Sequence, residues 1–140
     1  MPNQYFEGIL QLRNPNSLVI EFVYRQMEEK KGVFISKEVR MTNGVDLYFS
    51  SQRFLGNLGR KLQKTFGGEL KMNSSLHTKD HLSSKGLYRV NVYFRLPTVK
   101  KGDIVTVKGE EFEILGMGKK VIGKSLETGK KARLEYADLP

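Results

Sequence analysis

Residues 42–68 constrain the fold more than any other stretch, because a turn, a strand and an amphipathic helix follow one another there. Asn43-Gly44 predicts a hairpin turn, since both residues tolerate a positive φ. After it, Val45, Leu47 and Phe49 alternate with more polar residues, which is the period of a strand with one buried face. We therefore expect a sheet with a helix attached directly to one of its strands.

The helix in this stretch has two chemically different faces. It begins after Ser50 or Ser51, either of which can cap it, and Gly67-Gly68 ends it. Its apolar face consists of Phe54, Leu55, Leu58, Leu62 and Phe66. Its polar face carries four cations and no acid, namely Arg53, Arg60, Lys61 and Lys64. Without acids this face gains no ion pairs between successive turns, which leaves two interpretations, a solvated helix face and a phosphate-binding surface.

Two glycines stand in the interior of this helix. Gly56 and Gly59 each cost about 1 kcal/mol of helix stability relative to alanine. Close packing of the helix on a sheet, or on the backbone of a ligand, would account for them. The segment GNLG before Arg60-Lys61 is also compatible with the GXXG loop of KH domains, although the hydrophobic pattern runs through it without a break.

The other segments predict further strands and one more helix. Residues 5–13 predict a strand, one face of which is formed by Phe6, Gly8, Leu10 and Leu12. Asn14-Pro15 predicts the start of a helix that ends near Gly32. More strands are predicted at residues 33–41, 69–81 and 87–96, with a turn at residues 83–86. This order favours an α+β fold, in which two helices cover one face of a four- or five-stranded, largely antiparallel sheet.

The other face of this sheet is predicted to be open and to combine aromatic residues with arginines. It would carry Tyr5, Phe34, Arg40, Tyr48, Arg89, Tyr93 and Arg95. Such a face can stack bases and pair phosphates, as RRM domains do, although the RRM aromatic motifs are absent. The alternative is that this face packs on a second domain or on a protein partner.

Pro97 marks a predicted boundary between a domain at residues 1–97 and a smaller one at residues 98–140. Beyond it, short strands are predicted at residues 103–108, 111–117, 121–126 and 131–136. Their close spacing is typical of a small SH3-like β-barrel. Lys119, Lys120, Lys130 and Lys131 stand at its turns. There they either reach phosphates or are simply solvated.

The charge balance indicates the kind of partner. The chain has 24 Lys and Arg against 15 Asp and Glu, a net charge of +9 at pH 7. Residues 1–97 hold 15 basic and 8 acidic side chains, a net of +7, and residues 98–140 hold 9 and 7, a net of +2. A basic domain of this kind is typical of polyanion binders, most often of nucleic acid. A membrane surface is the weaker alternative, since no helix combines a basic face with a Trp-anchored apolar one.

Several other classes of protein are disfavoured. No apolar run approaches the ~20 residues of a membrane span, and no signal peptide is recognisable. With no Cys, disulfides and thiolate metal sites are excluded. His77 and His81 have a four-residue spacing but fall in a predicted strand or loop, so no metal site is expected. No catalytic residues, cofactor or small-molecule substrate are predicted, and a cytoplasmic, non-enzymatic protein is expected.

Four segments in fixed order resemble one protein family. They are YFEGILQLRNP (5–15), GVFISK (32–37), NGVDLYFSS (43–51) with the following RKL (60–62), and YRVNVYFRLP (88–97). Together they are similar to the archaeal branch of the Nmd3 family of large-ribosomal-subunit export adaptors. The resemblance implies that residues 1–97 resemble the domain likened to ribosomal protein eL22. It implies that residues 98–140 resemble the start of the domain likened to a hypusine-bearing translation factor.

The resemblance also has limits. The family's N-terminal zinc domain with its CxxC pairs has no counterpart here, so the chain is expected to be a fragment. The leucine-rich export signal and the hypusine-bearing lysine loop have no match either. What the resemblance implies is docking on the large ribosomal subunit, on rRNA and ribosomal proteins, late in subunit maturation. The alternative is a protein–protein adaptor whose sheet face docks a protein without touching RNA.

Overall fold

The computed structural model describes residues 5–80 and 85–140, and the side chains of these residues other than 75–80 and 85–88. The elements follow the order β1 (Gly8–Arg13), α1 (Ser17–Glu28), β2 (Ile35–Met41), β3 (Gly44–Phe49), α2 (Gln52–Phe66), β4 (Glu69–Asp80), β5 (Lys85–Arg95), β6 (Ile104–Val107), β7 (Glu110–Gly116), β8 (Val121–Ser125), β9 (Lys131–Leu134) and a 3-10 turn, Tyr136–Asp138. The predicted α+β class and the predicted sequence of strands and helices are confirmed.

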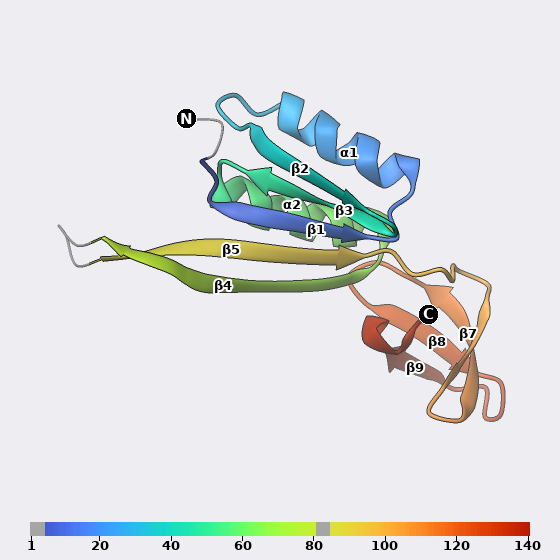
Figure 1. The fold of residues 1–140 in the computed structure, drawn as a ribbon. Coiled ribbons are helices and arrows are strands. Elements are labelled where there is room, and N and C mark those ends of the chain that lie inside the picture. Colours follow the sequence, from blue (N-terminus) through green and yellow to red (C-terminus); the bar gives the residue numbers. More distant parts are fainter. Residues whose placement is uncertain (1–4, 81–84) are drawn as a thin grey trace.

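The first five strands form one sheet, which we call the large sheet. Its order is β2-β3-β1-β5-β4, and Figure 1 shows it with both helices behind and above it. Every pair is antiparallel except β1 and β5, which run parallel in the middle of the sheet. The chain therefore crosses over before β5, and β2 and β4 are the two outer strands.

One core lies between the large sheet and both helices. Sheet residues such as Leu10, Leu47 and Val92 are fully or almost fully buried there. They pack with Val19 and Val23 of α1 and with Leu55, Leu58 and Leu62 of α2. The prediction that the two helices cover one face is confirmed, and the alternation of apolar residues along each strand is the physical reason.

Two local predictions were wrong in mechanism, and the predicted start of α1 was also two residues too early. Gly44 begins β3 with a φ outside the positive region; a Cβ on it would lie 2.0 Å from the Leu12 carbonyl oxygen. The cap of α1 is Asn16, whose Oδ1 accepts the Val19 N–H at 2.9 Å, and not Asn14. Asn14 instead has a φ of 54°, and its Nδ2 donates to the Leu96 carbonyl at 2.7 Å.

Two side chains lie on faces other than those predicted. Phe6 precedes β1 and turns to the open face, where its ring contacts Tyr48 edge-on at 4.8 Å. Arg40 lies opposite the buried Val45, so it belongs to the helix side of β2 and not to the open face. There it pairs with Glu38 at 2.9 Å, whose carboxylate also accepts the Tyr24 hydroxyl of α1 at 2.6 Å.

The last four strands form a second sheet, the small sheet, with its own core. Its order is β6-β7-β8-β9, and within the described residues no ladder joins β6 to β9. The sheet is an open meander, so the predicted SH3-like barrel is not confirmed, and neither is the likeness of the large sheet to eL22. The buried hydrophobic residues of this core are Val105, Val107, Phe112, Ile114, Val121, Leu134, Tyr136 and Leu139.

The strands β4 and β5 form a long antiparallel hairpin. Its ladder continues well past β1, from Ser75 opposite Arg89 to Asp80 opposite Lys85, and Figure 1 shows it projecting beyond the sheet. Part of the predicted turn, residues 83–84, and His81 lie outside the described residues, as does the side chain of His77.

In the described part of the chain, no helix has the length and apolar character to cross a membrane.

Candidate nucleic-acid interface

The outer side of α2 carries the four cations that the sequence placed there. Ser51 caps the helix by accepting the Phe54 N–H at 3.2 Å, and Gly67, with a φ of 74°, ends it. The apolar stripe is directed to the sheet, so the opposite side faces solvent. On that side Arg53, Arg60, Lys61 and Lys64 are all exposed.

None of these four cations has a carboxylate partner among the described residues. The ion pairs found there are Arg13–Asp46, Arg40–Glu38, Lys71–Glu69 and Arg95–Glu69. The contacts of the α2 cations are instead to amides. Arg60 donates to Asn57 at 3.0 Å, and Lys61 donates to Gln26 of α1 at 3.1 Å. The face therefore keeps its full positive charge, which a polyanion can neutralise.

The two glycines of α2 differ in their surroundings. A Cβ on Gly59 would lie 2.8 Å from Val92 Cγ1, so packing on the sheet explains this glycine. A Cβ on Gly56 would meet nothing closer than an Arg60 nitrogen at 3.7 Å, so packing does not explain that one. Because α2 is helical throughout residues 52–66, no GXXG loop of the KH type is present.

On the open face of the large sheet, the aromatic rings already have partners. Arg89 lies 3.7 Å from the Phe6 ring centre, and Phe6 contacts Tyr48. Lys37 lies 5.3 Å from the Tyr48 ring centre, and Lys71 lies 5.6 Å from that of Tyr93. Tyr48, Arg89 and Tyr93 are on this face as predicted. Lys37 and Lys71, which lie over the Tyr48 and Tyr93 rings, would compete with a base for stacking on these rings.

Arg95, which was predicted to contact RNA, holds the junction between the two sheets. Its guanidinium donates to Glu69 at 2.9 Å, to the Tyr136 carbonyl at 2.8 Å and to the Leu139 carbonyl at 2.9 Å. Burial alone would raise the pKa of Glu69, but hydrogen bonds from Arg95 and Lys71 lower it below its ordinary value. Arg95 is thus occupied with joining the small sheet to the large one.

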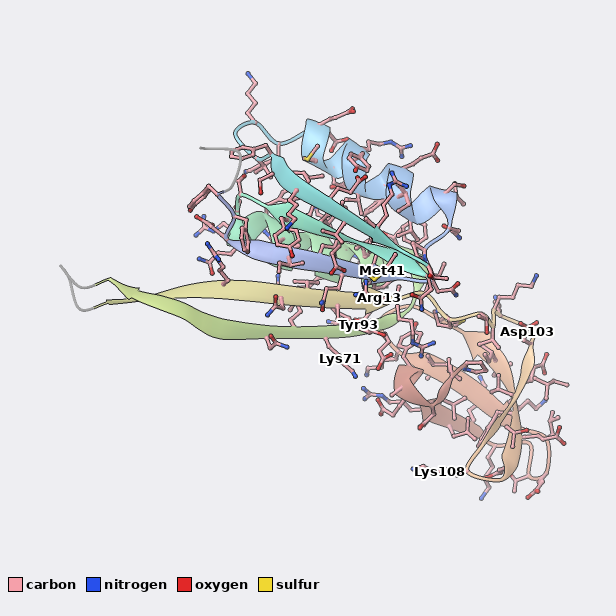
Figure 2. The ribbon with its side chains drawn as sticks, in the orientation of Figure 1. Arg13, Met41, Lys71, Tyr93, Asp103 and Lys108 are labelled. Carbon is pink, nitrogen blue, oxygen red and sulfur yellow. The ribbon has the colours of Figure 1, made fainter. Side chains whose placement is uncertain are left out.

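The lysines predicted at the turns of the small sheet lie in two places. Lys119 and Lys120 line a hollow of about 490 Å³ at the junction, together with Lys71 and Arg133. Figure 2 shows Lys71 and Tyr93 on the strands next to the small sheet. Lys130 and Lys131 are exposed at the β8–β9 turn and are not among the residues that line this hollow. Sequence reasoning missed Lys71 and Arg133, since only the docking of the two sheets brings them beside Lys119 and Lys120.

Among the side chains that the structure describes, no group of three or more His, Asp or Glu is arranged to hold a metal ion. The described structure thus has two positively charged features, the outer side of α2 and the hollow lined by Lys71, Lys119, Lys120 and Arg133. Such an arrangement can bind phosphates by charge and hydrogen bonding.

The chain matches the model of one known protein family. No curated protein matches the chain. The model of the second domain of NMD3 matches residues 5–96, which includes the large sheet, both helices and the cationic face of α2. This match covers more than half of the 140 residues, and the chain therefore belongs to the NMD3 family.

Proposed function

We propose that this chain is a non-catalytic module that docks on the large ribosomal subunit during its late maturation, through rRNA and ribosomal proteins. The family supports a role in ribosome biogenesis. The observation that carries the RNA contact is the outer side of α2, where four exposed cations have no carboxylate partner in the described structure. An archaeal source and a cytoplasmic location are part of the same proposal.

The proposed mechanism is electrostatic. Cations that neutralise phosphates release condensed counterions, which provides affinity that depends steeply on salt. Contacts to phosphates set the position of the protein without reading sequence, so shape decides where it docks. Arg53, Arg60, Lys61 and Lys64 are the residues proposed for this contact. Arg95 is excluded from it because its guanidinium is bound at the junction.

The alternative is a protein–protein adaptor that uses the open face of the large sheet. One observation favours it, namely that the Tyr48 and Tyr93 rings already contact cations of this chain. Such rings offer a packed, mixed surface that suits a protein partner better than a base. This docking would depend little on salt, because it buries apolar and paired groups.

Co-sedimentation with purified ribosomal subunits tests the proposal. The variant Arg60→Glu with Lys61→Glu is expected to lose binding to the large subunit, because it reverses two charges and breaks no ion pair, only exposed hydrogen bonds to Asn57 and Gln26. Lys100→Glu with Lys101→Glu is the matched control, since it reverses two adjacent exposed lysines of the segment before β6, which are not part of the cationic face of α2. Binding of the wild type should weaken with salt by about 0.7–0.9 log units per log unit for each phosphate contact.

The fold of each variant is checked by circular dichroism before binding is interpreted. If folded Arg60→Glu with Lys61→Glu binds as well as the wild type, the assignment of α2 is wrong. If wild-type binding to the large subunit is insensitive to salt, the adaptor alternative replaces RNA docking.

A further inference from the structure

Two hollows follow one another along β4, the outer strand of the large sheet. The first, about 540 Å³, lies between α2 and residues 72–74 of β4. The second, about 490 Å³, lies between residues 69–71, the end of α2 and the small sheet. Figure 1 shows β4 beginning beside the small sheet and running away from it. A ligand that follows β4 therefore passes from one hollow into the other.

These hollows are lined mostly by cations. Arg53 and Arg60 line the first, which has no acidic side chain. The second is lined by Lys71, Lys119, Lys120 and Arg133, against the two carboxylates of Glu69 and Glu135. Glu69 is already neutralised by Arg95, from which its carboxylate accepts at 2.9 Å. The path along β4 is thus complementary to a chain of negative charges.

The wall and floor of the first hollow provide more than charge. Gly56 lines it with bare backbone, and the nearest atoms to a Cβ there belong to Arg60. Because a glycine inside a helix is costly, its presence without a packing reason points to close approach by a ligand. The floor has exposed Met72, next to the hydroxyl of Ser74 on the same face of β4. An apolar side chain beside hydrogen-bonding groups suits a nucleobase.

The length of the path can be compared with a nucleic-acid strand. Residues 69–74 of an extended strand span roughly 17 Å. At the axial spacing of about 3.4 Å per nucleotide of a stacked duplex, this corresponds to at most about five nucleotides, and to fewer where the bases are unstacked. The two hollows together are therefore long enough for a short run of nucleotides, whereas one hollow alone is not.

We propose that one strand of RNA lies along β4, with its phosphates held by α2 at one end and by the small sheet at the other. This proposal rests on the proposed function and specifies the path of the RNA on the protein. Gly56 is the point of closest approach. Lys71, Lys119, Lys120 and Arg133 form the second half of the site, and the Arg95 contacts hold that half in place.

An acidic peptide is the competing occupant, since β4 is an outer strand to which a peptide strand could add. The first hollow argues for RNA, because its cations stand on α2 and not along the free edge of β4. A peptide paired to the edge would also gain nothing from the bare backbone at Gly56. The test therefore includes an acidic peptide of matched charge.

Fluorescence anisotropy with a labelled oligouridylate of about 12 nucleotides, longer than the path along β4, tests the proposal. Lys119→Glu with Lys120→Glu is expected to weaken binding about tenfold and to reduce the salt slope by about 1.4, the value for two phosphates of a single strand. Gly56→Gln is expected to weaken binding about tenfold without changing the net charge, because its side chain fills the place of the RNA backbone.

Matched controls separate position from charge and size. Lys100→Glu with Lys101→Glu has the same charge change in exposed lysines that line neither hollow. Thr65→Gln places the same new side chain at an exposed position of α2 that also lines neither hollow. Both controls should bind the oligonucleotide within about twofold of the wild type.

Three results would overturn the path along β4. One is that Lys119→Glu with Lys120→Glu loses no more affinity for the oligonucleotide than its control, Lys100→Glu with Lys101→Glu. Another is unchanged binding by Gly56→Gln, and the third is an acidic peptide that binds as tightly as the RNA. If these variants leave oligonucleotide binding intact while Arg60→Glu with Lys61→Glu abolishes subunit binding, the path falls and the docking function stands. If the path holds but no variant affects the subunit, the docking function falls instead.

Discussion

At the scale of the residue, Glu69 is the group whose ionisation matters most to the junction. Its carboxylate is buried, accepts from Arg95 Nε at 2.9 Å and lies 3.4 Å from Lys71 Nζ. Burial opposes its negative charge, but the two cations favour it more strongly, so its pKa is below the ordinary value of 4.5. The unfolded chain therefore takes up a proton at Glu69 at a higher pH than the folded chain does.

We expect the contribution of Glu69 to folding stability to be complete above its unfolded pKa of about 4.5. It should be lost as the pH falls from there through the lower folded pKa. The measurement is urea unfolding of the wild type and Glu69→Gln from neutral pH to about pH 3. The stability difference between the two should shrink below about pH 4.5; a difference that stays constant over this range would contradict the prediction.

Sequence alternation assigned most strand side chains to the correct face, and it could not assign their partners. Tyr93 and Arg95 lie on the open face as expected from the period of β5. The two carbonyls that accept from Arg95 are 41 and 44 residues further along the chain, and nothing in the local pattern points to them. Phe6 was misplaced for a related reason, since its residue precedes β1 and alternation does not apply to it.

At the scale of the element, the two glycines of α2 provide a matched pair. Gly59→Ala is expected to destabilise the protein by about 1–2 kcal/mol, since a new methyl group would overpack Val92, a stiff and fully buried side chain. Gly56→Ala is expected to stabilise it by up to about 1 kcal/mol, because helix propensity improves and no clash follows. Urea unfolding checks both, and equal effects of the same sign would refute the packing assignment.

Most elements could be predicted because their signals are local. The Ser51 cap, the apolar stripe of α2 and the stop at Gly67 all depend on residues within a few positions of one another. The errors occurred where a distant segment decides the local geometry. Asn14 does not cap α1 because it adopts a positive φ and binds Leu96. Gly44 is needed because of Leu12 on the neighbouring strand.

At the scale of the whole molecule, the sequence predicted the number of layers but not how the parts join. Element order does not specify that β5 returns parallel to β1, because either edge of β1 could have accepted it. One half of the candidate site could be predicted from the sequence, and the other half could not. The cationic face of α2 could be predicted from one helix, whereas the hollow at the junction draws Lys71, Lys120 and Arg133 from separate strands and turns.

Arg95 is the residue that joins the two sheets at this junction. Arg95→Met removes hydrogen bonds to Glu69, Tyr136 and Leu139, at a cost of about 2–3 kcal/mol for a charged group with several acceptors. The small sheet, with a core of few residues, is expected to be marginal without this attachment. Amide hydrogen exchange should therefore accelerate in β6 to β9 and remain slow in the centre of the large sheet.

Arg13→Met is the control for this experiment. Arg13 lies directly opposite Arg95 in the sheet; its side chain is 19% exposed, against 20% for Arg95, and it also pairs with one carboxylate, Asp46. Its partners all belong to the large sheet, so its loss should leave exchange in the small sheet relative to the large one unchanged. If Arg95→Met behaves in the same way, the small sheet is held by other contacts. The cations of the second hollow would then not depend on Arg95 for their position beside β4.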